Sequence, residues 1–284
     1  MNMKLSTNEL KYKANDIRQD IIGMLLEAGS GHSAGPLGMA DVFTSLYFDV
    51  LKHDPKNPEW EGRDYFILSC GHICPVLYAS LAEAGYFPKA ELKTLRKFGT
   101  RLQGHPHNLS LPGIETTSGP LAQGVSQAAG IAYGLKTDHK HNHVYVVMSD
   151  GEQQEGQVWE AVMFAGKYKL SNLTAILDRN NIQIDGYTED IMPLESLKAK
   201  YEAFNWHVME VDGHNIDQIS SACHEAKAIY EKPTVIIAHT IPGKGVDFME
   251  GDYKWHGTPP NKAQAKKALD ELRTLKGSIK GEHE

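Results

Sequence analysis

The sequence predicts an α/β fold, a doubly wound and mostly parallel sheet with helices on both of its faces. Five short apolar runs rich in β-branched residues have the length and composition of buried strands. These runs cover residues 65–69, 144–149, 173–177, 207–211 and 234–238. Strands that are apolar on both faces and alternate with helices are typical of a parallel sheet covered on each side.

The helical segments show apolar residues three or four positions apart, together with residues that start or stop helices. Residues 8–28 keep one apolar face and stop at Gly29, a residue type that commonly ends helices. Pro36 is expected to open a second helix, where its missing N–H costs nothing. The remaining predicted helices cover residues 124–135, 156–168, 194–204, 216–230 and 261–284.

Composition narrows the class of protein. The 284 residues carry a net charge of −7, which argues against a nucleic-acid binder, because such binding needs basic side chains on phosphates. No apolar run approaches the roughly 20 residues of a membrane span, and the polar N-terminus does not resemble a signal peptide. Three cysteines, an odd number, favour a reducing compartment, so we expect a cytoplasmic protein.

We expect one domain over residues 1–284, because no repeat or low-complexity linker divides the chain. Its core would span about residues 8–260, followed by a C-terminal helix and charged tail over residues 261–284.

Unusual residues follow three of the predicted strands. Gly71-His72 comes after the first strand, Asp150-Gly151 after the second and Asn180-Asn181 after the third. In parallel α/β sheets the ligand sits beyond the carboxyl ends of the strands, on loops that lead into helices. The sequence therefore predicts a ligand site at this edge of the sheet.

Two of these loops carry oxygen ligands suited to a magnesium ion. Asp150 supplies an anionic oxygen, Asn180 a neutral one and the Ile182 backbone carbonyl a third. Magnesium prefers hard oxygens in an octahedron and keeps phosphate oxygens among them. Gly151 lacks a Cβ, which lets a phosphate approach the backbone, and the following helix N-terminus favours negative charge. An isolated Asp-Gly is more often a turn, so the prediction depends on both pairs standing at strand ends.

The two pairs together resemble the signature of thiamine-diphosphate enzymes, an Asp-Gly pair followed downstream by Asn-Asn. Here 28 residues separate Gly151 from Asn180. Ser149 stands where that signature usually has a glycine, and because serine is small we expect the close approach to survive. The resemblance implies thiamine diphosphate as cofactor, bound through Mg²⁺ or another divalent cation such as Ca²⁺ or Mn²⁺.

Four histidine motifs and a rigid loop single out one family among the thiamine enzymes. The loop is the glycine- and proline-rich segment 112–124, and the histidines stand in Gly31-His32, Gly71-His72, Gly104-His105 and Trp255-His256-Gly257. With these motifs the chain resembles transketolase from about residue 8 to residue 260. A lone histidine beside glycine is more often a turn or core residue, but here four occur in the matching order. Of the other histidines, we interpret three as surface residues (His139, His141, His143) and four as structural ones (His207, His214, His224, His239).

The resemblance implies roles for the matching residues. His32 and His105 match histidines that line the substrate channel and bond sugar hydroxyls. His72 and His256 match histidines near the cofactor diphosphate and reaction centre, and His256 is expected to touch substrate as well. Imidazoles titrate near neutrality, so His32, His105 and His256 are the candidate proton-exchanging residues.

The remaining implied positions concern the cofactor and the metal. Glu155 matches a carboxylate at a contact between subunits near the aminopyrimidine ring. The loop expected to meet the aminopyrimidine and thiazolium rings is Gly119, Pro120 and Leu121. The diphosphate would lie against Gly151, with metal ligands from Asp150, Asn180 and the Ile182 carbonyl.

The resemblance also implies a second domain, which binds the aminopyrimidine and supplies an activating glutamate. No strand-helix series follows Pro260, so we expect a split enzyme that works with a C-terminal partner subunit in a heterotetramer. The implied reaction moves a two-carbon ketol unit between sugar phosphates. Alternatives are a branched-sugar ketol transferase, a subunit like deoxyxylulose-phosphate synthase or a 2-oxoacid dehydrogenase, and a non-catalytic cofactor-binding homodimer.

Overall fold

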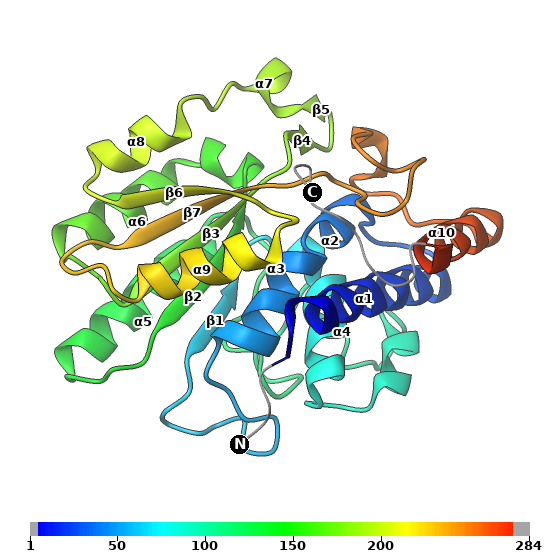
Figure 1. Cartoon of the computed structure of the whole chain (residues 1–284), viewed down its shortest axis with the longest axis horizontal. Coiled ribbons are helices and arrows are strands. Elements are labelled where there is room, and N and C mark those ends of the chain that lie inside the picture. The colour runs from blue at the N-terminus through cyan, green and yellow to red at the C-terminus, as the bar shows by residue number, and fades with distance from the viewer. Residues whose placement is uncertain (1–4, 275–284) are drawn as a thin grey trace.

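The computed structural model describes residues 5–274 and has a central sheet of five parallel strands in the order β1-β2-β3-β7-β6 (Figure 1). The strands are β1 (Tyr65–Leu68), β2 (Val144–Ser149), β3 (Leu173–Arg179), β6 (His207–Asp212) and β7 (Thr234–His239). The five predicted strands and their parallel arrangement are confirmed. Non-consecutive neighbours such as β3 and β7 require crossovers, which helices supply.

Successive residues of the central strands face opposite sides, which divides the core into two layers. On β2, Tyr145 and Val147 belong to one apolar cluster, while Val146 and Met148 belong to the other. Every residue of β2 and β3 is buried. Strand β6 is the least buried of the five: it lies at one edge of the sheet with a single neighbour and exposes Glu210.

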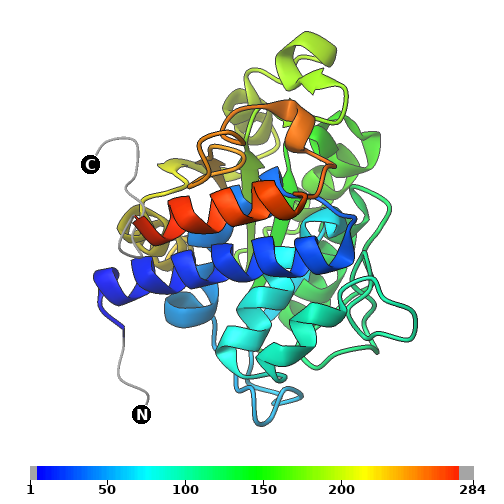
Figure 2. The same cartoon turned by 90° about the vertical axis from the view of Figure 1, so that its right-hand side faces the viewer.

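The first layer begins with the long helix α1 (Thr7–Ala28). Ser6 and Glu9 form a reciprocal capping box at its start, and Gly29 ends it with a positive φ of 61°. Helix α10 (Lys262–Thr274) lies alongside α1 (Figures 1 and 2), and the Asn15 side chain donates to the Leu272 carbonyl at 3.2 Å. The other helices of this layer are α3 (Ala40–Ser45), α4 (Cys74–Ala84) and α9 (Ile216–Ala226).

The second layer covers the opposite face with α5 (Gln123–Thr137), α6 (Gly156–Lys167) and α8 (Leu197–Ala203). Trp206 is buried in this layer and donates from Nε1 to the Val162 carbonyl at 2.9 Å. Buried apolar area of this kind supplies most of the stabilisation, about 25 cal/mol per Å².

Short elements surround the carboxyl ends of the strands. They include the β4–β5 hairpin (Ile182–Gln183 and Gly186–Tyr187) with α7 (Thr188–Ile191), and α2 (Ala34–Gly38). Of the 3₁₀ turns, η2 (Gly71–Ile73) and η4 (Gly151–Gln154) follow β1 and β2, and η5 (Tyr253–Trp255) precedes His256. The π-helical turn η1 (Leu46–Val50) lies instead near the amino end of β1, and the 3₁₀ turn η3 (Lys89–Thr94) packs against α1 and α4.

Several predicted helix boundaries differ from the structure. The helix expected over 194–204 begins only at Leu197, after Ser196 caps it, and the one expected over 216–230 ends at Ala226. Pro36 is the third residue of α2 rather than its opening residue. Helix α4 was not predicted, because it is buried on nearly all sides and lacks the polar stripe that reveals a surface helix. Of the helix expected over 261–284, residues 275–284 lie outside the described residues.

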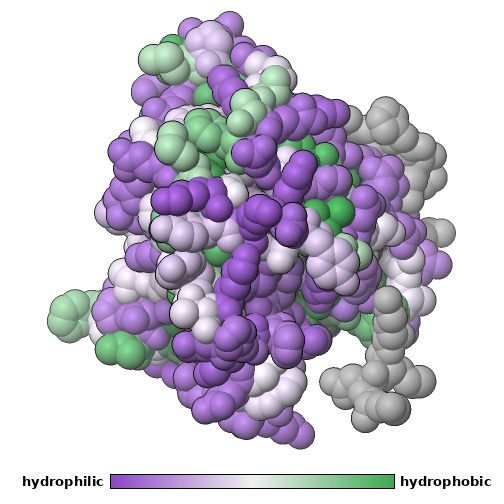
Figure 3. All heavy atoms as spheres, turned by 90° about the vertical axis from the view of Figure 1, so that its left-hand side faces the viewer, coloured by the Kyte–Doolittle hydropathy of each residue, from purple (hydrophilic) through white to green (hydrophobic). Residues whose placement is uncertain are grey.

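Within residues 5–274, no helix is both long and apolar enough to cross a membrane. The side of the molecule at the left of Figure 1 is mostly hydrophilic, with only small apolar patches (Figure 3).

Candidate functional site

The loops that follow the strands gather at one edge of the sheet. His72 lies in η2 after β1, Asp150 follows β2, and Asn180 follows β3. These three strands are neighbours in the sheet, so their carboxyl ends stand side by side. Figure 1 shows α2, the β4–β5 hairpin and the segment after β7 grouped at the same end. The edge predicted from the sequence is therefore the one where the candidate residues meet.

Three of the predicted histidines form a compact cluster. The ring centroids of His32 and His72 lie 5.0 Å apart, those of His32 and His256 5.4 Å, and those of His72 and His256 5.1 Å. All three side chains are half-buried. Three segments that lie far apart in the chain thus supply one imidazole-lined wall.

Two contacts between loops hold this cluster together. The Ser33 hydroxyl donates to the Thr258 carbonyl at 2.7 Å, which ties the turn containing His32 to the loop containing His256. The Gly243 N–H donates to the Ala34 carbonyl at 2.8 Å and fixes the segment after β7 against α2. Both bonds are local to the site, so the imidazole positions depend on these loops rather than on the sheet alone.

His105 lies beside the cluster but makes no ring contact with it among the described residues. A Cβ added at Gly71 would come within 2.7 Å of Ser118 Cβ and 3.2 Å of His105 Cδ2. Only glycine therefore lets the turn before His72 pack against the His105 loop. His105 is exposed, unlike the three clustered histidines.

The pKa values of all four histidines are lowered, by burial in the three clustered ones and by partial desolvation and the Arg96 charge in His105. The pKa of His32 falls to about 4, chiefly through burial and then through the nearby charges of His256, Arg96 and His105. Burial lowers the pKa of His72 well below its usual value and also lowers those of His256 and His105. The imidazoles are therefore neutral at pH 7 and can each donate and accept one hydrogen bond.

Acidification from pH 6.5 to pH 4 is expected to destabilise the chain in part through His32. The unfolded chain protonates this residue near its ordinary pKa of about 6.5, whereas the native state resists protonation until about pH 4. The unfolded state therefore binds more protons than the native state between pH 6.5 and pH 4. The contribution of His32 to the free energy of unfolding is fully present above pH 6.5 and is lost as the pH falls towards 4. The free energy of urea unfolding, measured at several pH values, should decline more steeply in the wild type than in His32→Gln.

His141→Gln, a change on an exposed loop, serves as the matched control and should leave the wild-type pH slope intact. Equal slopes for the wild type and His32→Gln between pH 6.5 and pH 4 would contradict the depressed pKa.

Asp150 is buried, with 1% of its surface exposed, and its two oxygens differ. Oδ2 accepts hydrogen bonds from Arg179 Nη1 at 3.1 Å, the Asn181 N–H at 2.8 Å and the Thr188 hydroxyl at 3.3 Å. Oδ1 is buried and has no hydrogen-bond partner among the described residues. Burial raises the pKa of Asp150, while the Arg179 charge and the Asn181 N–H oppose that rise.

The Asn180 amide has a fixed orientation. Its Nδ2 donates to Asp178 Oδ2 at 2.8 Å, and its Oδ1 accepts from the Ile182 N–H at 3.0 Å. Asp178 is fully buried beneath it and also accepts from the Thr240 hydroxyl. Burial raises the pKa of Asp178 to about 7. The sequence analysis missed Asp178, although a carboxylate at the end of a buried strand was the available signal.

The backbone around Gly151 leaves space for a ligand. A Cβ added at Gly151 would meet no protein atom within 4 Å, and the same holds at Gly119. The helix predicted to begin at Gly156 does so as α6, and the short 3₁₀ turn η4 lies between it and Asp150. Glu155 lies exposed just before α6.

Glu152 organises the loop that contains Gly119, Pro120 and Leu121, and the sequence analysis missed it. Its Oε1 accepts from the Ser69 hydroxyl at 2.5 Å and from the Ala122 N–H at 2.7 Å. Its Oε2 accepts from the Ser149 N–H at 2.8 Å. The side chain is fully buried and joins the ends of β1 and β2 to the loop. Pro120 and Leu121 remain exposed beyond this anchor.

The residues at the ends of β2 and β3 fit a divalent cation that shares phosphate oxygens. One buried carboxylate oxygen of Asp150 has no donor among the described residues, and the loop after β3 offers the neutral amide oxygen of Asn180, which accepts from the Ile182 N–H. Between residues 5 and 274, no group of three or more His, Cys, Asp or Glu side chains could hold a metal ion by itself. A site here would therefore need the additional oxygens of a ligand.

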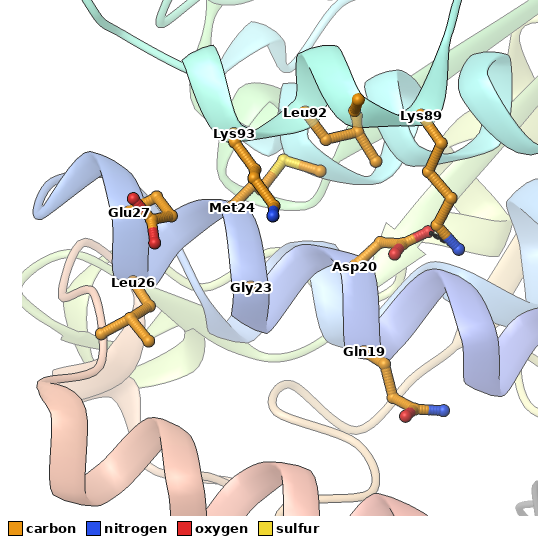
Figure 4. A pocket seen from close by; sticks show the side chains of 10 residues that line it. Gln19, Asp20, Gly23, Met24, Leu26, Glu27, Lys89, Leu92 and Lys93 are labelled. Carbon is orange, nitrogen blue, oxygen red and sulfur yellow. Dashed lines mark ion pairs between the residues drawn. The ribbon is translucent and has the colours of Figure 1, made fainter.

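Other features lie outside this site. His143, expected at the surface, is buried instead, because it immediately precedes β2 and pairs with the Thr174 hydroxyl at 2.8 Å. A pocket of about 310 Å³ lies between α1 and η3, where Lys89 forms an ion pair with Asp20 at 2.9 Å (Figure 4). None of its lining residues belongs to the histidine cluster or to the strand-end loops.

A family model described as "Transketolase, thiamine diphosphate binding domain" matches residues 10–274. Together with the parallel sheet and the site at its carboxyl edge, this match defines the chain as a thiamine-diphosphate-binding domain.

Individual relatives agree with the family model. The 6-deoxy-6-sulfo-D-fructose transketolase subunit SqwG of Clostridium sp. (strain MSTE9) is 45% identical and covers 93% of this chain and 96% of its own length. An apulose-4-phosphate transketolase subunit of Phocaeicola vulgatus is 39% identical, with 95% of each chain covered. The solved transketolase of Campylobacter jejuni superposes with a TM-score of 0.89 at 35% identity, over 95% of this chain and 43% of that one. The chain therefore belongs to the transketolase family.

The chain matches relatives of two different lengths. It spans nearly all of the two subunit relatives, but less than half of single-chain transketolases such as those of Campylobacter jejuni and Mus musculus. The part of the longer relatives that it matches is their thiamine-diphosphate-binding domain.

Proposed function

We propose that the chain binds thiamine diphosphate through a divalent cation and, with a second subunit, transfers a two-carbon ketol unit between sugars. The observation that carries the proposal is the common location of two features. The oxygen ligands after β2 and β3 share one sheet edge with the neutral histidine cluster of His32, His72 and His256. A cofactor anchored at the first feature would present its reactive part to the second.

Each strand-end residue has a defined task in this proposal. Asp150 Oδ1, Asn180 and the Ile182 carbonyl would hold Mg²⁺, Ca²⁺ or Mn²⁺, and the open space at Gly151 would accept the diphosphate. Gly119, Pro120 and Leu121, anchored through Glu152, would support the cofactor rings. The bound cofactor would supply the carbanion that attacks a ketose carbonyl, which no side chain of the chain can provide.

The histidines would exchange protons with the substrate and form hydrogen bonds to the sugar oxygens. His72, near the metal loops, would contact the diphosphate, while His32, His105 and His256 would bond the hydroxyls and the carbonyl oxygen of the sugar. Neutral imidazoles suit this work, because each can accept a proton from a hydroxyl and return it later. Burial of His32, His72 and His256 also strengthens hydrogen bonds to a developing oxyanion.

A second subunit is proposed to complete the site. Two close relatives are themselves named as subunits, and the chain matches only the cofactor-binding domain of the longer transketolases. The missing part would bind the aminopyrimidine and supply its activating carboxylate, with Glu155 at the contact between subunits. A heterotetramer of two such pairs, working in the cytoplasm, is the expected assembly.

The proposed donor is a ketose with an anionic group, and the acceptor is an aldose phosphate. The relatives named above act, by name, on a sulfonated ketose and on apulose 4-phosphate, a branched sugar. A branched-sugar ketol transfer is therefore the second candidate. Subunits like deoxyxylulose-phosphate synthase or a 2-oxoacid dehydrogenase are less well supported, because the histidine cluster suits a polyhydroxylated substrate.

Product analysis would separate these functions. The chain, combined with a neighbouring gene product that contains the activating domain, is incubated with thiamine diphosphate, Mg²⁺ and an aldose phosphate. Parallel reactions contain a ketose phosphate, 6-deoxy-6-sulfofructose, apulose 4-phosphate or pyruvate as donor. From at least one ketose donor we expect a new ketose two carbons longer than the acceptor, together with an aldose two carbons shorter than the donor. Reaction with pyruvate alone would overturn ketol transfer, and cofactor binding without any turnover would favour the non-catalytic homodimer.

A further inference from the structure

A buried guanidinium stands directly beside the proposed cation site. Arg179 is the last residue of β3, immediately before Asn180, and only 3% of its surface is exposed. It forms ion pairs with three carboxylates: Asp150 at 3.1 Å, Glu189 at 2.6 Å and Glu195 at 2.9 Å. Neither the metal nor the histidine cluster explains why a positive charge should occupy this position.

Charge alone would make Arg179 unfavourable here. A guanidinium next to a metal-binding carboxylate repels a divalent cation, and burial strengthens that repulsion. However, the arginine faces three carboxylates, so the charge around it stays negative. Glu189 and Glu195 offset the guanidinium while leaving it free to direct Asp150.

The hydrogen bonds show what Arg179 does to Asp150. The guanidinium, the Asn181 N–H and the Thr188 hydroxyl all donate to Oδ2. Oδ1 is left buried and has no donor among the described residues. The planar fork of an arginine can fix the plane of a carboxylate in a way that a lysine ammonium cannot. Arg179 is the charged donor among these three, and it thereby helps to leave Oδ1 free for a cation.

The same guanidinium anchors the segment after the β4–β5 hairpin. Its Nη2 donates to both glutamates, of which Glu189 lies in α7 and Glu195 in the stretch between α7 and α8. Glu189 in turn accepts from the Leu194 N–H at 3.1 Å, and Glu195 accepts from the Leu197 N–H at 3.2 Å. One side chain thus joins the end of β2, the end of β3 and the chain that continues from Ile182.

We propose that Arg179 is a positioning residue of the divalent-cation site: it fixes Asp150 with Oδ1 free for the metal and couples that geometry to the segment containing Glu189 and Glu195. This inference rests on the proposed function, because it requires a cation at Asp150. It assigns to Arg179 no contact with the cation, the cofactor or the substrate.

The test measures thiamine diphosphate binding by titration calorimetry at a series of MgCl₂ concentrations, using the chain together with its second subunit. Arg179→Met removes every donor at similar volume, and it should raise the Mg²⁺ concentration needed for half-maximal binding by about 10- to 100-fold. Arg179→Lys keeps the charge but not the planar guanidinium. The Mg²⁺ concentration that it needs for half-maximal binding should lie between those of Arg179→Met and the wild type. Lys169→Met breaks an exposed ion pair with Glu231 and should change nothing.

Unchanged or tighter Mg²⁺ dependence in Arg179→Met would overturn the inference, because the guanidinium would then act only as a repulsive charge or a structural support. If that variant fails to fold, an unshifted Arg179→Lys would overturn it equally. If the wild type bound thiamine diphosphate independently of Mg²⁺, the proposed metal site itself would be overturned. If the wild type required Mg²⁺ and the Arg179 variants showed the same Mg²⁺ dependence, only the inference about Arg179 would be overturned and the metal site would stand.

Discussion

Replacing Asp150 with alanine is expected to lower the Mg²⁺-dependent affinity for thiamine diphosphate by at least about 100-fold, which corresponds to about 2.7 kcal/mol. Loss of an outer-shell partner already costs about 10- to 100-fold in metal affinity, so loss of the only anionic protein ligand should cost at least the upper figure. Asn180 and the Ile182 carbonyl would remain, but neutral oxygens alone bind Mg²⁺ weakly. Calorimetric titration of the cofactor at fixed MgCl₂ measures this loss.

Asp150→Asn is the matched variant, since it keeps the shape and a hydrogen-bond acceptor while removing the charge. Asp150→Asn should lose most of the Mg²⁺-dependent affinity for thiamine diphosphate that Asp150→Ala loses. Both variants should fold, because Arg179 retains Glu189 and Glu195 as partners. Thermal unfolding without cofactor checks this. Normal cofactor affinity in Asp150→Ala would show that the metal is bound elsewhere or is not required.

Replacing His105 with alanine is expected to lower kcat by about 100-fold while changing thiamine diphosphate affinity by no more than about twofold. His105 lies beside Gly71 and is exposed, and no hydrogen bond among the described residues joins its side chain to Asp150 or Asn180. Its loss therefore should remove a proton-exchanging or hydroxyl-bonding group from the substrate channel without disturbing the cofactor. Steady-state ketol transfer by the two-subunit enzyme gives kcat, and calorimetry gives the affinity.

His107 offers a close control, because it is an exposed histidine only two residues away in the same loop. His107→Ala should leave both kcat and cofactor affinity unchanged. A His105→Ala enzyme that turns over normally would remove His105 from the candidate catalytic residues. Equal losses in both variants would indicate that the loop, rather than the imidazole, matters.

Much of the fold could be predicted because its signals are local. Apolar β-branched runs marked all five strands, and the alternation with helices gave the parallel sheet. Helix α4 could not be predicted, because it is buried on nearly all sides and lacks the polar stripe by which a surface helix is identified. The edge position of β6 also could not be foreseen, since strand order is set by crossovers between distant segments rather than by any one strand.

The candidate site was predictable to the extent that each residue stood in a recognisable motif. His32, His72 and His256 were singled out by glycine-flanked motifs, and the structure brings their rings together. Supporting residues such as Arg179 and Glu152 gave no such signal. Their roles come from buried contacts with segments far along the chain, and a charged residue in a strand-loop sequence looks like an ordinary solvated one.

The central proposal is that this chain holds the diphosphate and part of the substrate channel, while the cofactor is activated by a second subunit. The most direct measurement titrates the second subunit into a fixed amount of this chain and records ketol transfer with saturating thiamine diphosphate and Mg²⁺. We expect no turnover by either chain alone and a rate that rises to a plateau near equimolar mixing. Turnover by this chain alone, at the rate of the mixture, would contradict the proposal.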